Sequence, residues 1–156
     1  MRRLTTLLAL AGLALGTTTA LAASAATVGT RSTSLGTVLV GPNGHTLYMF
    51  SPDTKTKSHC TGECAVNWPP LTTKGAARVS GSAKASELGS ISRGGGVRQV
   101  TYDGHPLYEY IADTSAGQTS GQATDVDGGW WYVLSANGSI IKKSSKAGGG
   151  STKGAW

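Results

Sequence analysis

The sequence has few charged residues, few aromatic residues and only two cysteines. Of its 156 residues, 14% are charged, 6% are aromatic and 23 are glycine. So little charge is untypical of a disordered chain, and so much glycine is untypical of a helical bundle. The formal net charge of +6 includes Arg2, Arg3 and lysines near the C-terminus, so the rest of the chain is close to neutral. This balance argues against a nucleic-acid-binding protein.

Long apolar runs are missing except near the N-terminus. Residues 1–26 combine a basic start with an apolar stretch over residues 4–15 and small residues at 20–26. This pattern is typical of a secretory signal peptide, and its apolar stretch is too short for a membrane anchor. Because no cysteine lies near the cleavage region, we expect no lipid anchor on the mature protein. The sequence predicts an exported, soluble protein without a transmembrane segment.

The two cysteines, Cys60 and Cys64, are separated by three residues. In an exported chain the default expectation is a disulfide, which in so small a loop stabilises the fold by only about 2 kcal/mol. With His59 the same cysteines offer two thiolates and an imidazole, which are soft ligands for copper. A copper or redox site is therefore the alternative to the disulfide.

An internal repeat organises the middle of the chain. Residues 44–54 match residues 104–114 at a constant offset of 60, and both copies contain Gly-His-x-Leu-Tyr and Asp-Thr. The repeated motif residues are Tyr48, Phe50, Asp53, Tyr108, Tyr110 and Asp113. Two copies are too few for a solenoid, so we expect them to share one core. We place repeat one at about 35–74 and repeat two at about 88–142, with an apparent insertion of about seven residues near Arg93.

Each copy has the pattern of a β-hairpin. Residues 37–40 and 45–50 flank an Asn-Gly turn, and Asp-Gly plays the same part in the second copy. Residues 130–142 predict a further hairpin, and residues 82–88 a short helix. Since strand side chains alternate, Tyr48 and Phe50 share one face, which we expect to be the core face. The predicted fold is a single all-β domain over residues 27–143, built from two related hairpin repeats.

These motifs resemble a bacterial family of secreted repeats, described as predicted lipoproteins with a Tyr-x-(Phe/Trp/Tyr)-x-x-Asp motif. That motif occurs at residues 48–53 and 108–113, and Cys-x-Gly-x-Cys-Ala and Trp-Pro-Pro-Leu follow the first copy. The resemblance covers roughly residues 35–137 and implies an extracytoplasmic protein. Many members are lipid-anchored, whereas this chain lacks the cysteine, so we expect free secretion or cell-wall association. The function of the family is uncharacterised.

Two pairs of repeated polar residues are candidates for chemistry. His45 and His105 occupy equivalent positions after the turns and form a possible metal or haem pair, although residues beside hairpin turns are usually exposed. Asp53 and Asp113 resemble the paired carboxylates of a hydrolase. An Asp before a Thr at a strand end more often caps a turn, and we favour capping.

Tryptophan offers the candidate binding surface. Trp68, Trp130 and Trp131 could stack on a sugar or a porphyrin, but large aromatic residues in a small domain usually belong to the core. Because Trp130 and Trp131 are adjacent in a strand, they point to opposite faces, and one of them is the best surface candidate. Residues 144–156 form a basic Gly/Ser-rich tail that we expect to be flexible, and its lysines could contact anionic wall polymers.

Motifs of known enzymes are missing. The sequence contains no Gly-x-Ser-x-Gly, His-Glu-x-x-His, Walker or dinucleotide-binding pattern. We therefore expect a non-catalytic binding or structural module of the cell envelope, without a cofactor, whose partner is a cell-wall polymer or an envelope protein. The alternative is an extracytoplasmic electron-transfer or copper-handling protein that uses Cys60 and Cys64.

Overall fold

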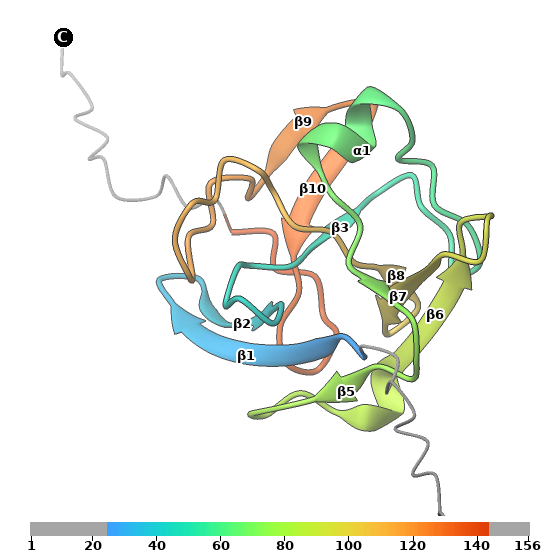
Figure 1. The fold of residues 1–156 in the computed structure, drawn as a ribbon. Helices are drawn as coiled ribbons and strands as arrows, with labels where there is room; N and C mark the ends of the chain where they lie inside the picture. Colours follow the sequence, from blue (N-terminus) through green and yellow to red (C-terminus); the bar gives the residue numbers. More distant parts are fainter. Residues whose placement is uncertain (1–24, 144–156) are drawn as a thin grey trace, which may run out of the picture.

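The computed structural model describes residues 25–143 (Figure 1). Nearly all of the expected signal peptide, and the tail at 144–156, lie outside the described residues. The elements are β1 (Thr27–Thr33), β2 (Gly36–Val40), β3 (Tyr48–Phe50), α1 (Glu63–Asn67), β4 (Thr72–Thr73), β5 (Arg78–Val79), the 3-10 turn η1 (Ala85–Glu87), β6 (Leu88–Ser92), β7 (Arg98–Tyr102), β8 (His105–Pro106), β9 (Thr124–Val126) and β10 (Gly129–Val133). The expectation of an all-β fold is confirmed.

The strands form three small sheets. Their orders are β2-β1-β5, β3-β10-β9 and β4-β7-β6, and β8 pairs with β7. All of these pairings are antiparallel except that of β1 with β5. No helix in the described part of the chain is long and apolar enough to cross a membrane.

The hairpins β1–β2 and β6–β7 are equivalent in the two repeats. Gly29 pairs with Val40 in the first, and Gly89 pairs with Thr101 in the second. The offset is therefore 60 between β1 and β6 and 61 between β2 and β7, so the apparent insertion of about seven residues near Arg93 is wrong. The apparent insertion resulted from aligning the start of β2 with the start of β6. The pairing within the two hairpins shows instead that β1 corresponds to β6. Repeat one consequently begins before residue 35.

The two repeats exchange their final extended segments. The N–H of Leu39 in repeat one donates to the carbonyl of Leu134 in repeat two, at 3.0 Å. Reciprocally, the N–H of Val100 in repeat two donates to the carbonyl of Leu71 in repeat one, at 2.8 Å. Trp-Pro-Pro-Leu at 68–71 is therefore the structural equivalent of Trp-Tyr-Val-Leu at residues 131–134. Each repeat completes the other, so the two share one body.

The point where the repeats meet lies between Tyr48 and Tyr108. The N–H of Tyr48 donates to the carbonyl of Tyr108 at 2.8 Å, and the N–H of Tyr108 donates to the carbonyl of Tyr48 at 3.0 Å. Such mutual bonding between equivalent residues is the arrangement found on a two-fold axis. The duplicated chain thus folds with internal two-fold pseudosymmetry.

Apolar side chains are buried on both faces of the chain around β3. Tyr48 and Phe50 pack in one cluster with Cys60 and Val133, as expected. Leu47 and Met49 are also buried, in a second cluster that includes Leu39, Val100, Leu107 and Leu134. The expectation of a single core face is therefore wrong, because the exchanged segments cover the side that a lone hairpin would expose to water.

The short helices differ from the expectation. The helix expected at residues 82–88 is only the turn η1, after which Leu88 already begins β6. The α-helix α1, which the sequence did not predict, starts directly after Gly62, inside the disulfide loop. Residues 129–131 of β10 pair with β9 through a turn at Asp127 and Gly128, both of positive φ. The expected return strand after Gly138 is reduced to one bridge, between Leu134 and Ile140.

Candidate functional site

The motif tyrosines and aspartates form two crossed hydrogen bonds between the repeats. The hydroxyl of Tyr48 donates to Oδ2 of Asp113, and the hydroxyl of Tyr108 donates to Oδ2 of Asp53, both at 2.5 Å. Each bond therefore joins the tyrosine of one repeat to the aspartate of the other. The motif residues act as a reciprocal clamp, which the sequence spacing alone does not reveal.

The second carboxylate oxygen of each aspartate holds a loop of its own repeat. Oδ1 of Asp53 accepts the N–H of His59 at 2.7 Å, and Oδ1 of Asp113 accepts the N–H of Ser120 at 2.9 Å. This geometry agrees with the capping interpretation. Both oxygens of each carboxylate are engaged, and Asp113 is only 1% exposed. The pair is thus built into the frame rather than presented to a substrate.

Burial controls the ionisation of the clamp. It raises the pKa of Tyr48 and Tyr108 far above the ordinary value, and the neighbouring carboxylates add to the rise. Burial also raises the pKa of Asp53 above 3.8, against the opposing effect of hydrogen bonds from His59 and Tyr108. Both hydroxyls therefore stay protonated and act as donors at physiological pH.

Four aromatic rings form a continuous stack across the pseudosymmetry axis. Trp68 and Trp131 lie face to face at the centre, with centroids 3.9 Å apart and planes inclined by 2°. Tyr110 stacks on Trp68 at 4.1 Å, and Phe50 stacks on Trp131 at 4.3 Å. Trp68 and Trp131 are 1% and 0% exposed. As binding candidates they are therefore corrected to core residues.

Cys60 and Cys64 form the disulfide, with Cα atoms 5.2 Å apart. This bond engages both sulfurs that the copper alternative requires, so thiolate ligation would first need its reduction. His59 lies beside the clamp, where its Nδ1 is 4.0 Å from Oδ1 of Asp53. Among residues 25–143, no three His, Cys, Asp or Glu side chains are grouped in a way that could hold a metal ion.

The repeated histidines are each half-buried. Nδ1 of His45 lies 3.9 Å from a carboxylate oxygen of Glu109. Burial lowers the pKa of His105, although the negative charge of Asp103 partly opposes this. Each histidine thus has a carboxylate from a nearby residue as its neighbour, Glu109 for His45 and Asp103 for His105, and this arrangement does not favour a shared ligand between the two.

Trp130 is the exposed member of the adjacent tryptophan pair. It is 43% exposed, whereas Trp131 points to the core from the other face of β10. The ring of Tyr132, two residues further on the same face, lies nearly parallel to that of Trp130 at 6.0 Å. The alternation of β10 thus accounts for one exposed and one buried tryptophan.

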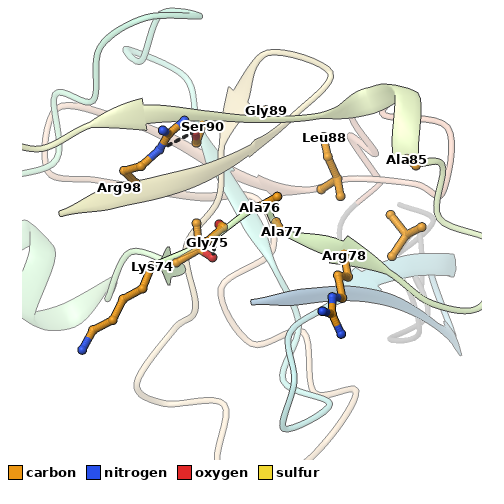
Figure 2. Close-up of a pocket in the computed structure, with 12 residues that line it drawn as sticks. Lys74, Gly75, Ala76, Ala77, Arg78, Ala85, Leu88, Gly89, Ser90 and Arg98 are labelled. Atoms are coloured by element: carbon orange, nitrogen blue, oxygen red, sulfur yellow. Dashed lines mark hydrogen bonds between the residues drawn. The ribbon is translucent and has the colours of Figure 1, made fainter. Parts of the chain in front are cut away.

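A groove of about 460 Å³ separates β5 from β6. One side is formed by residues 73–79, which connect the repeats, and the other by Ala85, residues 88–90 and Arg98. Small or apolar side chains cover much of the lining, including Ala76, Ala77 and Leu88. Figure 2 shows β6 along one side and the connecting segment along the other. A second hollow of about 300 Å³ adjoins the groove, because Thr73 and Lys74 line both.

Three exposed cations are among the residues that line the groove: Lys74, Arg78 and Arg98. In Figure 2 the side chains of Lys74 and Arg78 extend from the connecting segment away from β6, and Arg98 lies beside Ser90. Arg98 contacts the hydroxyl of Ser90 through its Nε at 3.0 Å. In residues 25–143 the carboxylates within 4.0 Å of a basic group are those beside His45 and His59, so none neutralises these three. The groove therefore combines an apolar lining with uncompensated positive charge.

Sequence reasoning missed the groove residues. It treated the body of the chain as nearly neutral and assigned the positive charge to the tail. A signal was nonetheless present, because residues 72–98 contain five cationic side chains and one carboxylate, a net charge of +4. Charge counted over short windows would have indicated this region.

The fold and the clamp define an all-β module made of two interlocked repeats. Two matches to one family model, described as a secreted repeat of unknown function, cover residues 29–72 and 89–135. The chain belongs to this family, and the expected resemblance and duplication are confirmed. The protein is accordingly of secreted type, and its disulfide agrees with an extracytoplasmic location. No curated protein and no solved structure matches the chain.

Proposed function

We propose that this protein is a non-catalytic binding module of the cell envelope, which holds an anionic partner in the groove between β5 and β6. The observation that supports this proposal is the set of three cations, Lys74, Arg78 and Arg98, around one groove without carboxylate partners. Positive charge placed around an apolar hollow attracts anions and raises their local concentration.

The remainder of the molecule supplies a rigid frame for this groove. Within the protein, the hydroxyls of Tyr48 and Tyr108 are hydrogen-bonded to Asp113 and Asp53, and both cysteine sulfurs are joined in the disulfide. One wall of the groove belongs to β6, in the hairpin of repeat two, and the other to β5, which is attached to the hairpin of repeat one. Because the repeats are clamped together, the two walls keep a fixed separation.

The test measures how much mature protein sediments with washed cell-envelope particles. Replacing Lys74, Arg78 and Arg98 by Ala removes three groove cations, and we expect retention to fall by about tenfold at low salt. A matched control replaces three exposed lysines elsewhere, Lys55, Lys57 and Lys142, and so gives the same net charge.

The two triple variants separate the groove from general charge attraction. If the control variant loses as much retention as the groove variant, binding depends on net charge and the groove is not the site. Raising the salt concentration is expected to weaken retention of the wild type, because exposed charges are screened beyond a distance of about 8 Å at 0.15 M ionic strength.

A further inference from the structure

We infer that the groove binds an extended acidic peptide as an added β-strand. This inference rests on the proposed function and names its ligand class, a segment of an envelope protein. It is carried by two facing strand edges whose outward backbone groups have no hydrogen-bond partner within residues 25–143, and by the charge around them.

The edge of β6 that faces the groove is open. In the part of the chain that the structure describes, β6 is the last strand of its sheet and pairs with β7 alone. Arg93 donates its N–H to the carbonyl of Val97 at 2.9 Å, which marks a bonded pair. In an antiparallel ladder every second residue is bonded, so Ile91 and Gly89 also face β7. The N–H and carbonyl of Ser90 between them therefore point away from β7, toward the groove side.

The edge of β5 is open on the opposite wall. Arg78 donates its N–H to the carbonyl of Ala26 at 2.8 Å, and Ser80 donates its N–H to the carbonyl of Val28 at 3.0 Å. These alternate residues bond to β1, so the N–H and carbonyl of Val79 between them point to the other side. Unpaired strand edges are templates for pairing with another extended chain.

The lining leaves room for the side chains of such a strand. Gly75, Ala76 and Ala77 line one side, and Gly89 the other. In Figure 2 these short residues lie along the groove between the longer side chains of Lys74, Arg78 and Arg98. An added strand places alternate side chains on each face, which favours small groove residues beneath it.

The charge selects the kind of peptide. Three cations without carboxylate partners favour Asp or Glu in the added strand. The chain's own residues 144–156 contain two lysines and no acidic residue. Their charge has the same sign as the groove, so the occupant we infer comes from a partner protein.

The experiment titrates the mature full-length protein with a blocked eight-residue peptide of alternating Glu and Val. The comparison peptide has the same sequence with N-methyl groups at every second residue, which removes backbone donors but keeps the charge. Because each lost hydrogen bond costs about 1 kcal/mol, we expect the comparison peptide to bind at least about tenfold more weakly.

A pair of variants tests the same point from the protein side. Ser90→Pro removes the N–H at the open edge of β6, where proline is tolerated because that group pairs with no neighbouring strand. Ser90→Ala removes only the hydroxyl and keeps the N–H. Both variants lose the hydroxyl that contacts Arg98, so the difference between them reports the N–H alone, and we expect Ser90→Pro to bind the peptide about fivefold more weakly than Ser90→Ala does. If Ser90→Pro lowers the melting temperature markedly, strand addition is judged from the binding of the parent and N-methylated peptides to the wild-type protein.

The outcomes separate this inference from the proposed function. Equal binding of the parent and N-methylated peptides would overturn strand addition. If poly(glycerol phosphate) also bound and required the groove cations, the partner would be an anionic wall polymer, and the proposed function would stand without this inference. If neither the acidic peptide nor the polymer bound in a manner that depends on Arg78 and Arg98, both proposals would fail.

Discussion

The hydroxyl of Tyr48 lies 2.5 Å from a carboxylate oxygen of Asp113, 65 positions later in the chain. Both residues are buried, and the same hydroxyl accepts the N–H of Gly121 at 3.3 Å. Tyr48→Phe keeps the ring but leaves Oδ2 of Asp113 and this N–H without their bonds to the hydroxyl. We expect the free energy of unfolding to fall by about 2–3 kcal/mol, measured by denaturant titration. Tyr132→Phe, at a half-buried surface ring, is the control and should change it by less than about 0.5 kcal/mol.

The ionisation of Asp53 predicts a pH effect. Its pKa is raised by burial, so the folded state binds the proton more tightly than the unfolded chain does. The resulting contribution to stability is fully present below the unfolded value of about 3.8 and is lost as the pH rises through the higher folded value. We expect the stability of the wild type relative to Asp53→Asn to decline over that interval. Urea titrations of both proteins across acidic pH measure it, and a constant difference would contradict the assignment.

The exchange of segments predicts that neither half of the domain folds alone. Residues 27–80 lack the partner for Leu39, and residues 81–143 lack the partner for Val100. Each half also exposes apolar surface that the other normally covers. We expect separate halves to lack near-UV circular dichroism as monomers, and an equimolar mixture to recover it. A half that folds by itself as a monomer would disprove the interlocked arrangement.

The ring stack predicts opposite outcomes for two tryptophans. Trp68→Ala removes a buried ring that contacts Trp131 and Tyr110, and we expect a loss of about 3–5 kcal/mol in the free energy of unfolding. Trp130→Ala removes a ring that is 43% exposed, and we expect a loss of less than about 1 kcal/mol. Thermal unfolding of the two variants tests this, and similar losses would show that burial does not distinguish the rings.

The repeat and the strand content could be predicted because they depend on local patterns. A constant offset of 60 and turn pairs such as Asn43–Gly44 are visible in the residues themselves. The exchange between repeats could not be predicted in this way. Both copies carry the same apolar pattern, so the sequence does not say whether Leu71 pairs within its own repeat or with Val100 of the other. Tertiary packing decides that question.

The candidate site was less accessible to sequence reasoning than the fold. The aspartates accept loop N–H groups, which agrees with the capping interpretation, but their cross-repeat tyrosine partners depend on the exchange. The groove cations are far apart in sequence, since Arg98 lies 20 positions after Arg78. Only the placement of β5 against β1 and of β6 against β7 brings them to one hollow.

The segment that joins the repeats breaks the symmetry of the molecule. Duplication ordinarily yields two copies of every surface, but residues 73–79 follow repeat one and have no structural counterpart after repeat two. There the chain turns back instead, and Ile141 donates its N–H to the carbonyl of Val133. Within residues 25–143, a body with two-fold internal symmetry therefore carries the hollow between β5 and β6 once, and an occupant of it would be held in a single orientation with one-to-one stoichiometry.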